Sequence, residues 1–259
     1  MLAQDQGSVE ILVRDDGSTD RTLEILRSRR LDAERGEHVG FVRSFGRLLA
    51  GADADYVAFC DQDDVWLPDK LSRAVARLER VSGPALYCGR LAVVDEGLEP
   101  VGLSPVPRRG LSFANALVES QASGCTIVLN RAARELVGSF PAEVVSHDWW
   151  LYLVLSALGG IVYDEQPAIL FRKHGGQAFG IGVGATDTWR AKLTRGPSVL
   201  PQVRAFARAF GDRLGEEERR ILERFLERSR LRYALRPDVY RQARRDDALL
   251  RAKLALGLI

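Results

Sequence analysis

Two segments decide the fold: Val9-Glu-Ile-Leu-Val-Arg-Asp-Asp-Gly-Ser-Thr-Asp20 and Tyr56-Val-Ala-Phe-Cys-Asp-Gln-Asp-Asp-Val-Trp-Leu-Pro-Asp-Lys-Leu71. In each, a run of apolar and β-branched residues ends abruptly in carboxylates, and a helical pattern follows. Alternating strand and helix units are typical of α/β domains with a largely parallel sheet, whose ligands bind at the carboxyl ends of the strands. The sequence therefore predicts an α/β domain with acidic side chains at its ligand-binding edge.

The rest of the chain divides into a body and a helical end. We expect helices over 19–29, 40–50, 70–81, 112–119 and 146–158, and strands over 8–14, 56–60, 85–94, 161–164 and 168–172. From about residue 199 the pattern is helical to the end. We predict a catalytic body over 1–185, a linker over 186–198 and a basic helical C-terminal region over 199–259.

The composition excludes several classes of protein. With 259 residues, 46% of them hydrophobic and 28% charged, the chain has the averages of a globular protein and not of a disordered or fibrous one. No apolar run approaches the roughly 18 residues that a membrane span needs. The first residues lack the layout of a signal peptide, so we expect a cytoplasmic protein. The three cysteines form no CxxC pair, which indicates reduced, buried thiols.

The charge is distributed unevenly along the chain. Residues 1–189 hold 19 Lys and Arg against 26 Asp and Glu, whereas residues 190–259 hold 18 against 9. A basic end can meet nucleic acid, anionic lipid or an acidic partner. Few aromatic residues interleave the arginines and no nucleic-acid motif is present, so we expect no nucleic-acid partner. The apolar stripes are expected to pack on the body or on a second copy, and the arginine-rich face can dock on the inner membrane face.

The two acidic clusters are the candidate functional residues. Asp15 and Asp16 follow one predicted strand, and Asp61, Asp63 and Asp64 follow another. Grouped carboxylates repel one another unless a cation or a hydrogen-bonding ligand relieves them, and hard oxygen ligands suit Mg²⁺ or Mn²⁺ bound to a diphosphate. The first cluster alone is also an Asp-Gly turn signal. The second is the sharper functional signal, because it directly follows a run of core residues.

Together these segments resemble the nucleotide-binding and DxD motifs of family 2 glycosyltransferases with a GT-A fold, especially the bacterial rhamnosyltransferase-like branch. The resemblance covers roughly residues 2–180. It implies a Rossmann-like nucleotide-diphospho-sugar transferase with a mixed, mainly parallel sheet flanked by helices, followed here by a C-terminal helical appendage. Further matches follow in order: Gly124-Cys125-Thr126 through Asn130-Arg131, His147-Asp148-Trp149-Trp150 and Phe171-Arg172-Lys173-His174.

The resemblance implies a donor site and a metal site. It places four side chains at the base, ribose and phosphates of a dTDP- or UDP-sugar: Asp15, Asp16, Asp61 and Arg172. It makes Asp63 and His174 ligands of Mg²⁺ or Mn²⁺, which would neutralise the leaving diphosphate.

The resemblance also implies a catalytic base and an acceptor site. An inverting enzyme needs one carboxylate to take the acceptor's proton, and Asp148 stands at that position. Five residues would line the acceptor site: Trp149, Trp150, Gly124, Cys125 and Thr126. The expected reaction moves a sugar, with dTDP-rhamnose as the candidate donor, to a saccharide or lipid-linked acceptor of a bacterial surface polymer. In the alternative interpretation, Asp148 caps its helix and the tryptophans belong to the core.

The chain departs from the family pattern at its start. Family members usually carry an apolar first strand and a Pro-x-Tyr-Asn-like turn well ahead of the Asp-Asp-Gly-Ser motif, whereas only 14 residues precede Asp15 here. We therefore expect the first strand to be missing from the domain. His38 and Ser44 stand where related sequences often have Asn.

Two other functions compete with the transferase. A catalytically inactive, nucleotide-sugar-binding homologue would keep the motifs without turnover. A haloacid dehalogenase-like phosphatase would use Asp61 as its nucleophile, but it leaves Asp15, Asp148 and Arg172 without a role.

Overall fold

The computed structural model describes residues 3–173, 198–227 and 238–256. The strands are β1 (Val13–Asp15), β2 (Ala33–Arg35), β3 (Tyr56–Ala58), β4 (Val65–Trp66), β5 (Ala85–Gly89), β6 (Ala92–Val94), β7 (Pro100–Leu103), β8 (Val128–Asn130), β9 (Gly160–Asp164) and β10 (Ile169–Arg172). The helices are α1 (Thr22–Ser28), α2 (Phe41–Gly51), α3 (Lys70–Leu78), α4 (Phe113–Ala116), α5 (Arg131–Val137), α6 (His147–Leu158), α8 (Leu200–Phe210), α9 (Glu216–Leu226) and α11 (Arg244–Leu256), with short 3-10 turns η1 (Gly124–Thr126) and η2 (Gly211–Arg213).

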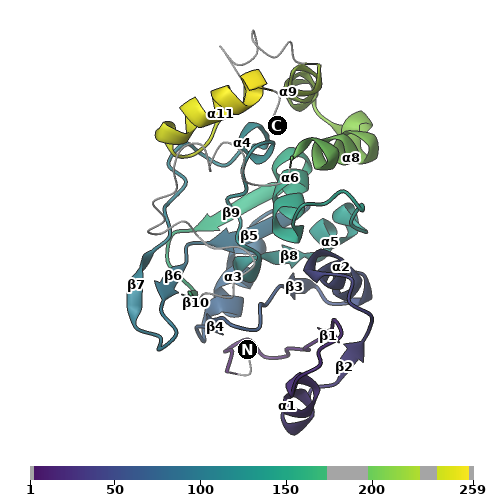
Figure 1. The fold of residues 1–259 in the computed structure, drawn as a ribbon, viewed down its shortest axis with the longest axis vertical. Helices are drawn as coiled ribbons and strands as arrows, with labels where there is room; N and C mark the ends of the chain where they lie inside the picture. Colours follow the sequence, from purple (N-terminus) through teal and green to yellow (C-terminus); the bar gives the residue numbers. More distant parts are fainter. Residues whose placement is uncertain (1–2, 174–197, 228–237, 257–259) are drawn as a thin grey trace.

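The strands form three small sheets flanked by helices, and the predicted α/β class with a mixed sheet is confirmed. The sheets have the orders β1-β2, β4-β10-β6-β7 and β3-β8-β5-β9 (Figure 1). In the described ranges three pairings are parallel, β1 with β2, β10 with β6 and β5 with β9, and four are antiparallel. The pairing is therefore mixed, and one of its antiparallel strands, β8, lies between β3 and β5. The strand expected over 8–14 begins only at Val13.

Helix α6 lies at the centre of the core. Its residues from Trp150 to Leu155 are all buried, and they share one hydrophobic cluster with Leu86 of β5 and Leu129 of β8. A helix that is apolar on all sides is stable only when other elements cover it on all sides. Figure 1 shows how this is met, with the β3-β8-β5-β9 sheet on one side of α6 and the C-terminal helices on the other.

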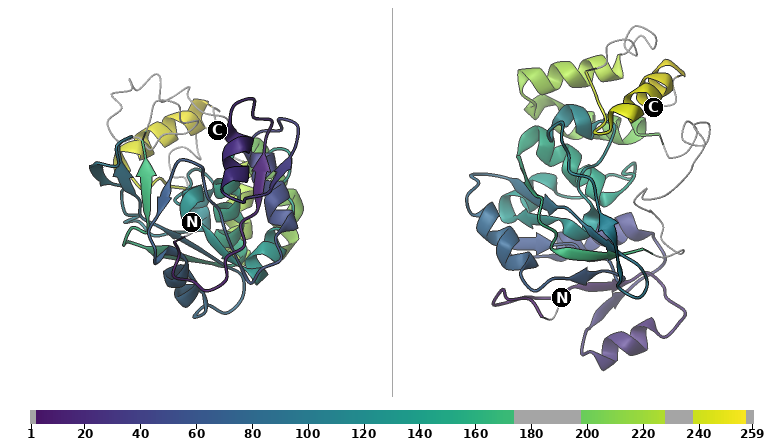
Figure 2. Two further views of the ribbon diagram at one scale, coloured as in Figure 1. Left: turned by 90° about the horizontal axis from the view of Figure 1, so that it is seen from below. Right: turned by 90° about the vertical axis from the view of Figure 1, so that its left-hand side faces the viewer.

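The C-terminal helices pack on the body, as their apolar stripes predict. Phe206 of α8 lies with its ring centroid 5.3 Å from that of Phe113 in α4, and Phe225 of α9 and Leu254 of α11 belong to the same core cluster. The right-hand view in Figure 2 shows these helices, in green and yellow, gathered at one end of the molecule, opposite the purple helix α1. Residues 199–259 thus share their core with the body wherever the structure describes them.

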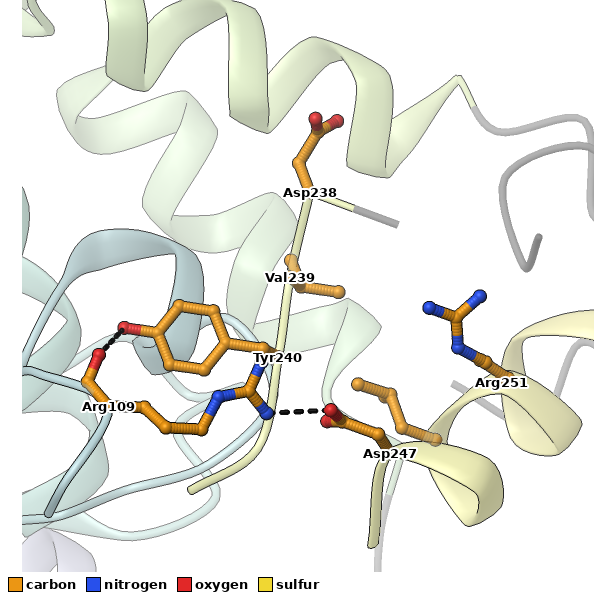
Figure 3. A pocket seen from close by; sticks show the side chains of 7 residues that line it. Arg109, Asp238, Val239, Tyr240, Asp247 and Arg251 are labelled. Carbon is orange, nitrogen blue, oxygen red and sulfur yellow. Dashed lines mark hydrogen bonds and ion pairs between the residues drawn. The ribbon is translucent and has the colours of Figure 1, made fainter. Parts of the chain in front are cut away.

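Polar contacts also join the C-terminal helices to the body. Arg109, in the loop before α4, pairs with Asp247 of α11 at 2.6 Å, and the guanidinium lies over the ring of Tyr240 (Figure 3). These residues line a cavity of about 150 Å³ together with Asp238, Val239, Leu250 and Arg251. Since Arg109 already has an anionic and an aromatic partner, we interpret this cavity as part of the packing between body and C-terminal helices.

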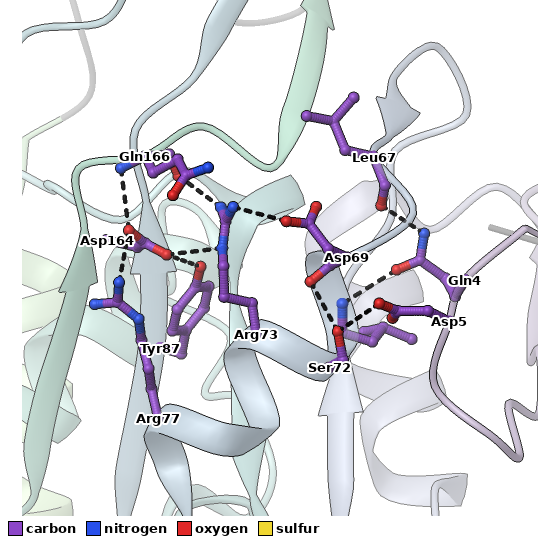
Figure 4. Close-up of polar contacts among 11 residues, drawn as sticks. Gln4, Asp5, Leu67, Asp69, Ser72, Arg73, Arg77, Tyr87, Asp164 and Gln166 are labelled. Atoms are coloured by element: carbon purple, nitrogen blue, oxygen red, sulfur yellow. Dashed lines mark hydrogen bonds and ion pairs between the residues drawn. The ribbon is translucent and has the colours of Figure 1, made fainter.

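A buried ion-pair network fixes β9 against α3. The Asp164 side chain is 1% exposed and contacts Nε of Arg73 at 3.0 Å and Nη2 of Arg77 at 3.1 Å (Figure 4). The hydroxyl of Tyr87 donates to the same carboxylate at 2.9 Å. In the same figure, Gln4 bonds to Leu67 and Leu71, which anchors the N-terminal segment beside the start of α3.

We expect Asp164→Asn to destabilise the protein by about 3 kcal/mol, because Arg77 loses its carboxylate partner at a buried site and Arg73 keeps only its pair with Asp69. The control is Asp53→Asn, since Asp53 is 86% exposed where it pairs with Arg131, and it should cost less than about 1 kcal/mol. Urea denaturation of both variants measures the difference. Equal, small losses would show that the network contributes no more than a surface pair.

Candidate active site

The second acidic cluster forms a turn, residues 61–64, between β3 and β4, and we call it the acid turn. The end of β10 holds it in place, since the backbone amide of Arg172 donates to Oδ1 of Asp64 at 3.2 Å. The other carboxylate oxygen of Asp64 is buried and has no hydrogen-bond partner within the described structure. The turn therefore presents an acceptor that its own protein surroundings do not satisfy.

The acid turn combines burial with mutual repulsion. Burial raises the pKa of Asp61, and so do the charges of Asp64, Asp63 and Asp148. Together they bring this pKa to about 7. Burial likewise raises the pKa of Asp64. A divalent cation would relieve this repulsion, and carboxylate oxygens are the ligands that Mg²⁺ and Mn²⁺ prefer. The donor set therefore fits such an ion.

The geometry indicates different ligands for that ion than the DxD spacing, which predicts Asp63. Ligand atoms of Asp61, Asp64 and Cys125 lie within 4.8 Å of one another. Burial raises the pKa of the Cys125 thiol well above its ordinary value, so this group stays protonated and is a poor ligand for a hard cation. Asp61 and Asp64 are thus the carboxylates that the structure brings together. Asp63 stays a predicted ligand, and its charge acts on both neighbours.

Asp148 lies close to the acid turn. It occupies the first turn of α6 and is half-buried, and its Oδ1 accepts a hydrogen bond from the amide of Trp149 at 2.7 Å. A Cβ built on Gly124 would lie 3.7 Å from Cβ of Asp148, and a ligand atom of the next residue, Cys125, lies within 4.8 Å of those of Asp61 and Asp64. The charge of Asp148 is also one of those that raise the pKa of Asp61. A residue 84 positions away from Asp64 thus reaches the same site, because α6 begins beside η1.

His147 is a feature of the site that the sequence did not indicate as functional. Its ring is buried, lies 4.3 Å from the ring of Phe45 and 5.3 Å from that of Phe59, and has no hydrogen-bond partner for either nitrogen in the described structure. Burial lowers the pKa of His147, so the ring is held neutral. A Cβ built on Gly124 would lie 2.6 Å from Nε2 of His147, so only glycine lets this ring approach η1.

Lys70 is a second residue that the sequence did not single out. Its side chain is completely buried at the start of α3, and Nζ lies 3.5 Å from the ring centroid of Trp66. Burial lowers the pKa of Lys70 to about 7. The sequence could have indicated the burial of Lys70, because this lysine lies on the apolar side of an amphipathic helix. It could not have indicated the contact with Trp66.

Asp15 and Asp16 serve the local backbone. The carboxylate of Asp15 is buried and accepts from the amide of Ser18, which closes the turn after β1. Asp16 accepts from the amides of Val39 and Gly40 at 2.9 and 2.8 Å, at the start of α2. Against the effect of burial, these hydrogen bonds lower the pKa of Asp16, as does its bond to Arg14. The turn interpretation is therefore supported, and their contact with a donor stays a proposal.

The structure also corrects the predicted acceptor site. Trp150 is 1% exposed and packs against Phe206 and Phe210, so the expectation that it stacks on a sugar is wrong. Trp149 is half-buried, and its indole N–H donates to the carbonyl of Ala116. Gly124, Cys125 and Thr126 are buried in η1 and offer no exposed floor.

Of the two predicted phosphate or metal contacts, Arg172 and His174, the structure describes only Arg172. It is the last residue of β10 and is half-buried. His174 and the glycine-rich segment after it lie outside the described residues.

The fold and the site define a glycosyltransferase of the GT-A type. The sequence model for "Glycosyl transferase family 2" matches residues 1–135, and the chain belongs to this family. In the described ranges, no helix combines the length and apolar character that crossing a bilayer requires.

Several relatives agree with this assignment. The chain is 25% identical over 214 residues to the dTDP-rhamnosyl transferase RfbG of Shigella flexneri, covering 75% of this chain and 72% of that protein. It is 26% identical over 252 residues to an uncharacterised glycosyltransferase of Nostoc, covering 90% and 76%. It matches an uncharacterised protein of Mycobacterium tuberculosis at 28% over 208 residues, covering 76% of this chain but only 59% of that protein.

Solved structures share the fold at low sequence identity. TarS (residues 1–349) of S. aureus has a TM-score of 0.55 at 18% identity and covers 98% of this chain and 72% of its own. The mannosyltransferase PcManGT of Pyrobaculum calidifontis, in complex with GDP-Man and Mn²⁺, has a TM-score of 0.50 at 19% identity and covers 100% and 74%.

The pKa of Asp61 predicts how stability depends on pH. The group titrates near 7 in the folded protein and near 3.8 ordinarily, so between these values the folded state holds a proton that the unfolded state has lost. Stability contributed by the protonated group is therefore present at low pH and lost as the pH rises through about 7. In EDTA, Asp61→Asn should gain stability over the original protein as the pH rises from about 5 to 8.

Thermal denaturation at several pH values measures this gain, with the exposed Asp32→Asn as the control that should show none. Mn²⁺ added at about pH 7.5 should raise the melting temperature of the original protein more than that of Asp61→Asn. A parallel pH dependence in both proteins would contradict the burial of charge at the acid turn.

Proposed function

We propose that this chain is an inverting glycosyltransferase that moves a sugar from a nucleoside diphosphate to an acceptor hydroxyl. The observation that carries the proposal is that η1 contacts both groups of carboxylates: Gly124 lies against Asp148, and Cys125 lies beside Asp61 and Asp64. Asp61 and Asp64 fit a divalent cation, and Asp148 remains to accept a proton. The presence of GDP-Man and Mn²⁺ in the related PcManGT complex supports a nucleotide-sugar donor and metal use.

In the proposed step, the acceptor oxygen attacks C1 of the donor sugar, and its proton passes to a carboxylate oxygen of Asp148. The bond between C1 and the diphosphate oxygen breaks, and the nucleoside diphosphate leaves. When bound, Mg²⁺ or Mn²⁺ would stabilise the charge on the leaving group. Asp61 and Asp64 would hold the ion, with Asp63 and His174 as further predicted ligands. Arg172 would contact the phosphates from the end of β10.

The proposed donor is dTDP-rhamnose, and a UDP-sugar is the alternative. Similarity to RfbG, whose name records dTDP-rhamnosyl transfer, supports the first choice. Asp15 and Asp16 would contact the base and ribose from the turn after β1. Only part of this contact is open to a ligand, since the side chain of Asp16 is 23% exposed and that of Asp15 is buried.

The proposed acceptor is a saccharide or lipid-linked saccharide of a bacterial surface polymer, and the proposed place of action is the cytoplasm. A peripheral membrane contact would follow from the basic charge of residues 190–259, and a homodimer from the apolar stripes of the C-terminal helices. Where the structure describes these helices, several arginines already have carboxylate partners: Arg208 with Glu143, Arg220 with Glu217 and Arg224 with Asp238. This pairing weakens the case for a membrane contact through α8 and α9.

An inactive homologue is the second candidate function. The hydrogen bonds of Asp15 and Asp16 favour this candidate. They stabilise the local backbone, so both residues would have a structural role in a protein without turnover. It requires that nucleotide binds and nothing is released.

Asp148→Asn should lower turnover by about 10³-fold, within the range that loss of a general base produces, and leave donor affinity unchanged. The measurement is nucleoside diphosphate release from a panel of dTDP- and UDP-sugars with Mn²⁺, and donor binding by calorimetry. The exposed Asp212→Asn is the control and should keep full activity. Binding without turnover in the original protein would support the inactive homologue. Metal-independent phosphate release that Asp61→Asn abolishes would support a phosphatase.

A further inference from the structure

We propose that a groove beside α2 binds the apolar chain and phosphate of a lipid-linked acceptor. The groove lies between one side of α2 and the segment 139–144 that leads from α5 into α6, and we call it the α2 groove. The proposal rests on the proposed function, because it assigns a substrate class to the acceptor side of the same site.

The groove is large enough for a chain of several isoprene or alkyl units. Its volume is about 610 Å³, within the range of small-molecule sites. Its wall is mostly apolar and includes Val39, Phe41, Phe140, Pro141 and Val144. A sugar alone needs many polar partners, and this wall offers few. A hydrocarbon chain gains free energy by leaving water against such a wall.

Two cations stand beside this apolar wall. Arg43 and Arg47 are one helical turn apart on α2, both are exposed, and both line the groove. No acidic side chain lines it. Guanidinium groups bind phosphate through paired hydrogen bonds. An apolar wall with two cations and no anion is complementary to an amphiphile that carries a phosphate at one end of its chain.

A chain of contacts leads from the α2 groove to Asp148. Phe41 lines the groove, and its ring lies 6.1 Å from that of His147. His147 in turn lies against Gly124, where a built Cβ would be 3.7 Å from Cβ of Asp148. The groove segment 139–144 also runs directly into the helix that carries Asp148. An acceptor anchored in the groove would therefore present its sugar near the proposed base.

The groove accounts for a lipid-linked acceptor better than the C-terminal helices do. The arginines named above on α8 and α9 pair with carboxylates, and the apolar faces of those helices are buried in the core. At the α2 groove, the apolar wall is open and both arginines lack an ion-pair partner within the described structure.

The test measures binding of farnesyl phosphate, below its aggregation concentration, by calorimetry. Two control ligands accompany it: farnesol, which lacks the phosphate, and inorganic phosphate, which lacks the hydrocarbon chain. We expect farnesyl phosphate to bind at least about tenfold more tightly than either, and the double variant Arg43→Gln/Arg47→Gln to lose about tenfold or more of that affinity. Ala142→Trp places a large side chain in the groove from an exposed position and should abolish binding.

The matched control is Arg27→Gln/Arg204→Gln, which removes the same charge from exposed positions on α1 and α8 and should bind as the original protein does. Equal affinity in Ala142→Trp and the original protein would overturn the proposal. Binding to vesicles of anionic phospholipid without binding of farnesyl phosphate would also overturn it, and would indicate a membrane surface.

A kinetic comparison separates this proposal from the proposed function. Nucleotide release by donor hydrolysis should be unchanged in the groove variants, whereas transfer to a glycosylated farnesyl phosphate should show a raised KM at constant kcat. Farnesyl phosphate binding by a protein without any turnover would refute the transferase and keep the groove. Full transfer by Ala142→Trp with unchanged KM would refute the groove and keep the transferase.

Discussion

Repulsion among the buried carboxylates of the acid turn is the constraint on which the site depends. Burial and neighbouring charge raise the pKa of Asp61 to about 7, and one oxygen of Asp64 stays unsatisfied. Such a turn costs folding free energy, and the hydrogen bond from the amide of Arg172 to Asp64 offsets part of that cost. The same unrelieved charge makes the turn receptive to a cation.

Helix α6 connects this charged site to the stability of the whole molecule. Its central residues are enclosed by the sheet and by α8, so the helix is fixed in position, and its first turn carries Asp148 to the edge of the acid turn. The C-terminal helices contribute to the site through this packing, because they cover α6 on the side away from the sheet. A carboxylate on a helix that is fixed in this way keeps its distance from the acid turn.

The sequence singled out Asp61, Asp64 and Asp148 because carboxylates after a core strand and at a helix start are locally unusual, and the structure brings Asp61 and Asp64 together. The hydrogen bond from the amide of Ser18 to Asp15 agrees with the Asp-Gly turn signal that the sequence carries. The prediction for Trp150 did not include its enclosure by Phe206 and Phe210, because α8 lies far away along the chain. The sequence also did not indicate that β8 runs antiparallel to β5, because the direction of a strand depends on pairing with residues far away along the chain. The uniform apolar character of α6 did hold the information that Trp150 is interior.

The site and the α2 groove divide the surface by charge, and His147 stands at the boundary. The acid turn is anionic, the groove carries Arg43 and Arg47, and the ring between them is kept neutral by burial among Phe41, Phe45 and Phe59. A phosphate of the acceptor is attracted to the groove and repelled by the acid turn, while a divalent cation is attracted in the opposite direction. The nucleotide-sugar donor with its cation and the phosphate-bearing acceptor would then each bind at their own site, the donor at the acid turn and the acceptor in the α2 groove. A charged imidazole at that boundary would weaken the separation, and the apolar rings around His147 oppose its protonation.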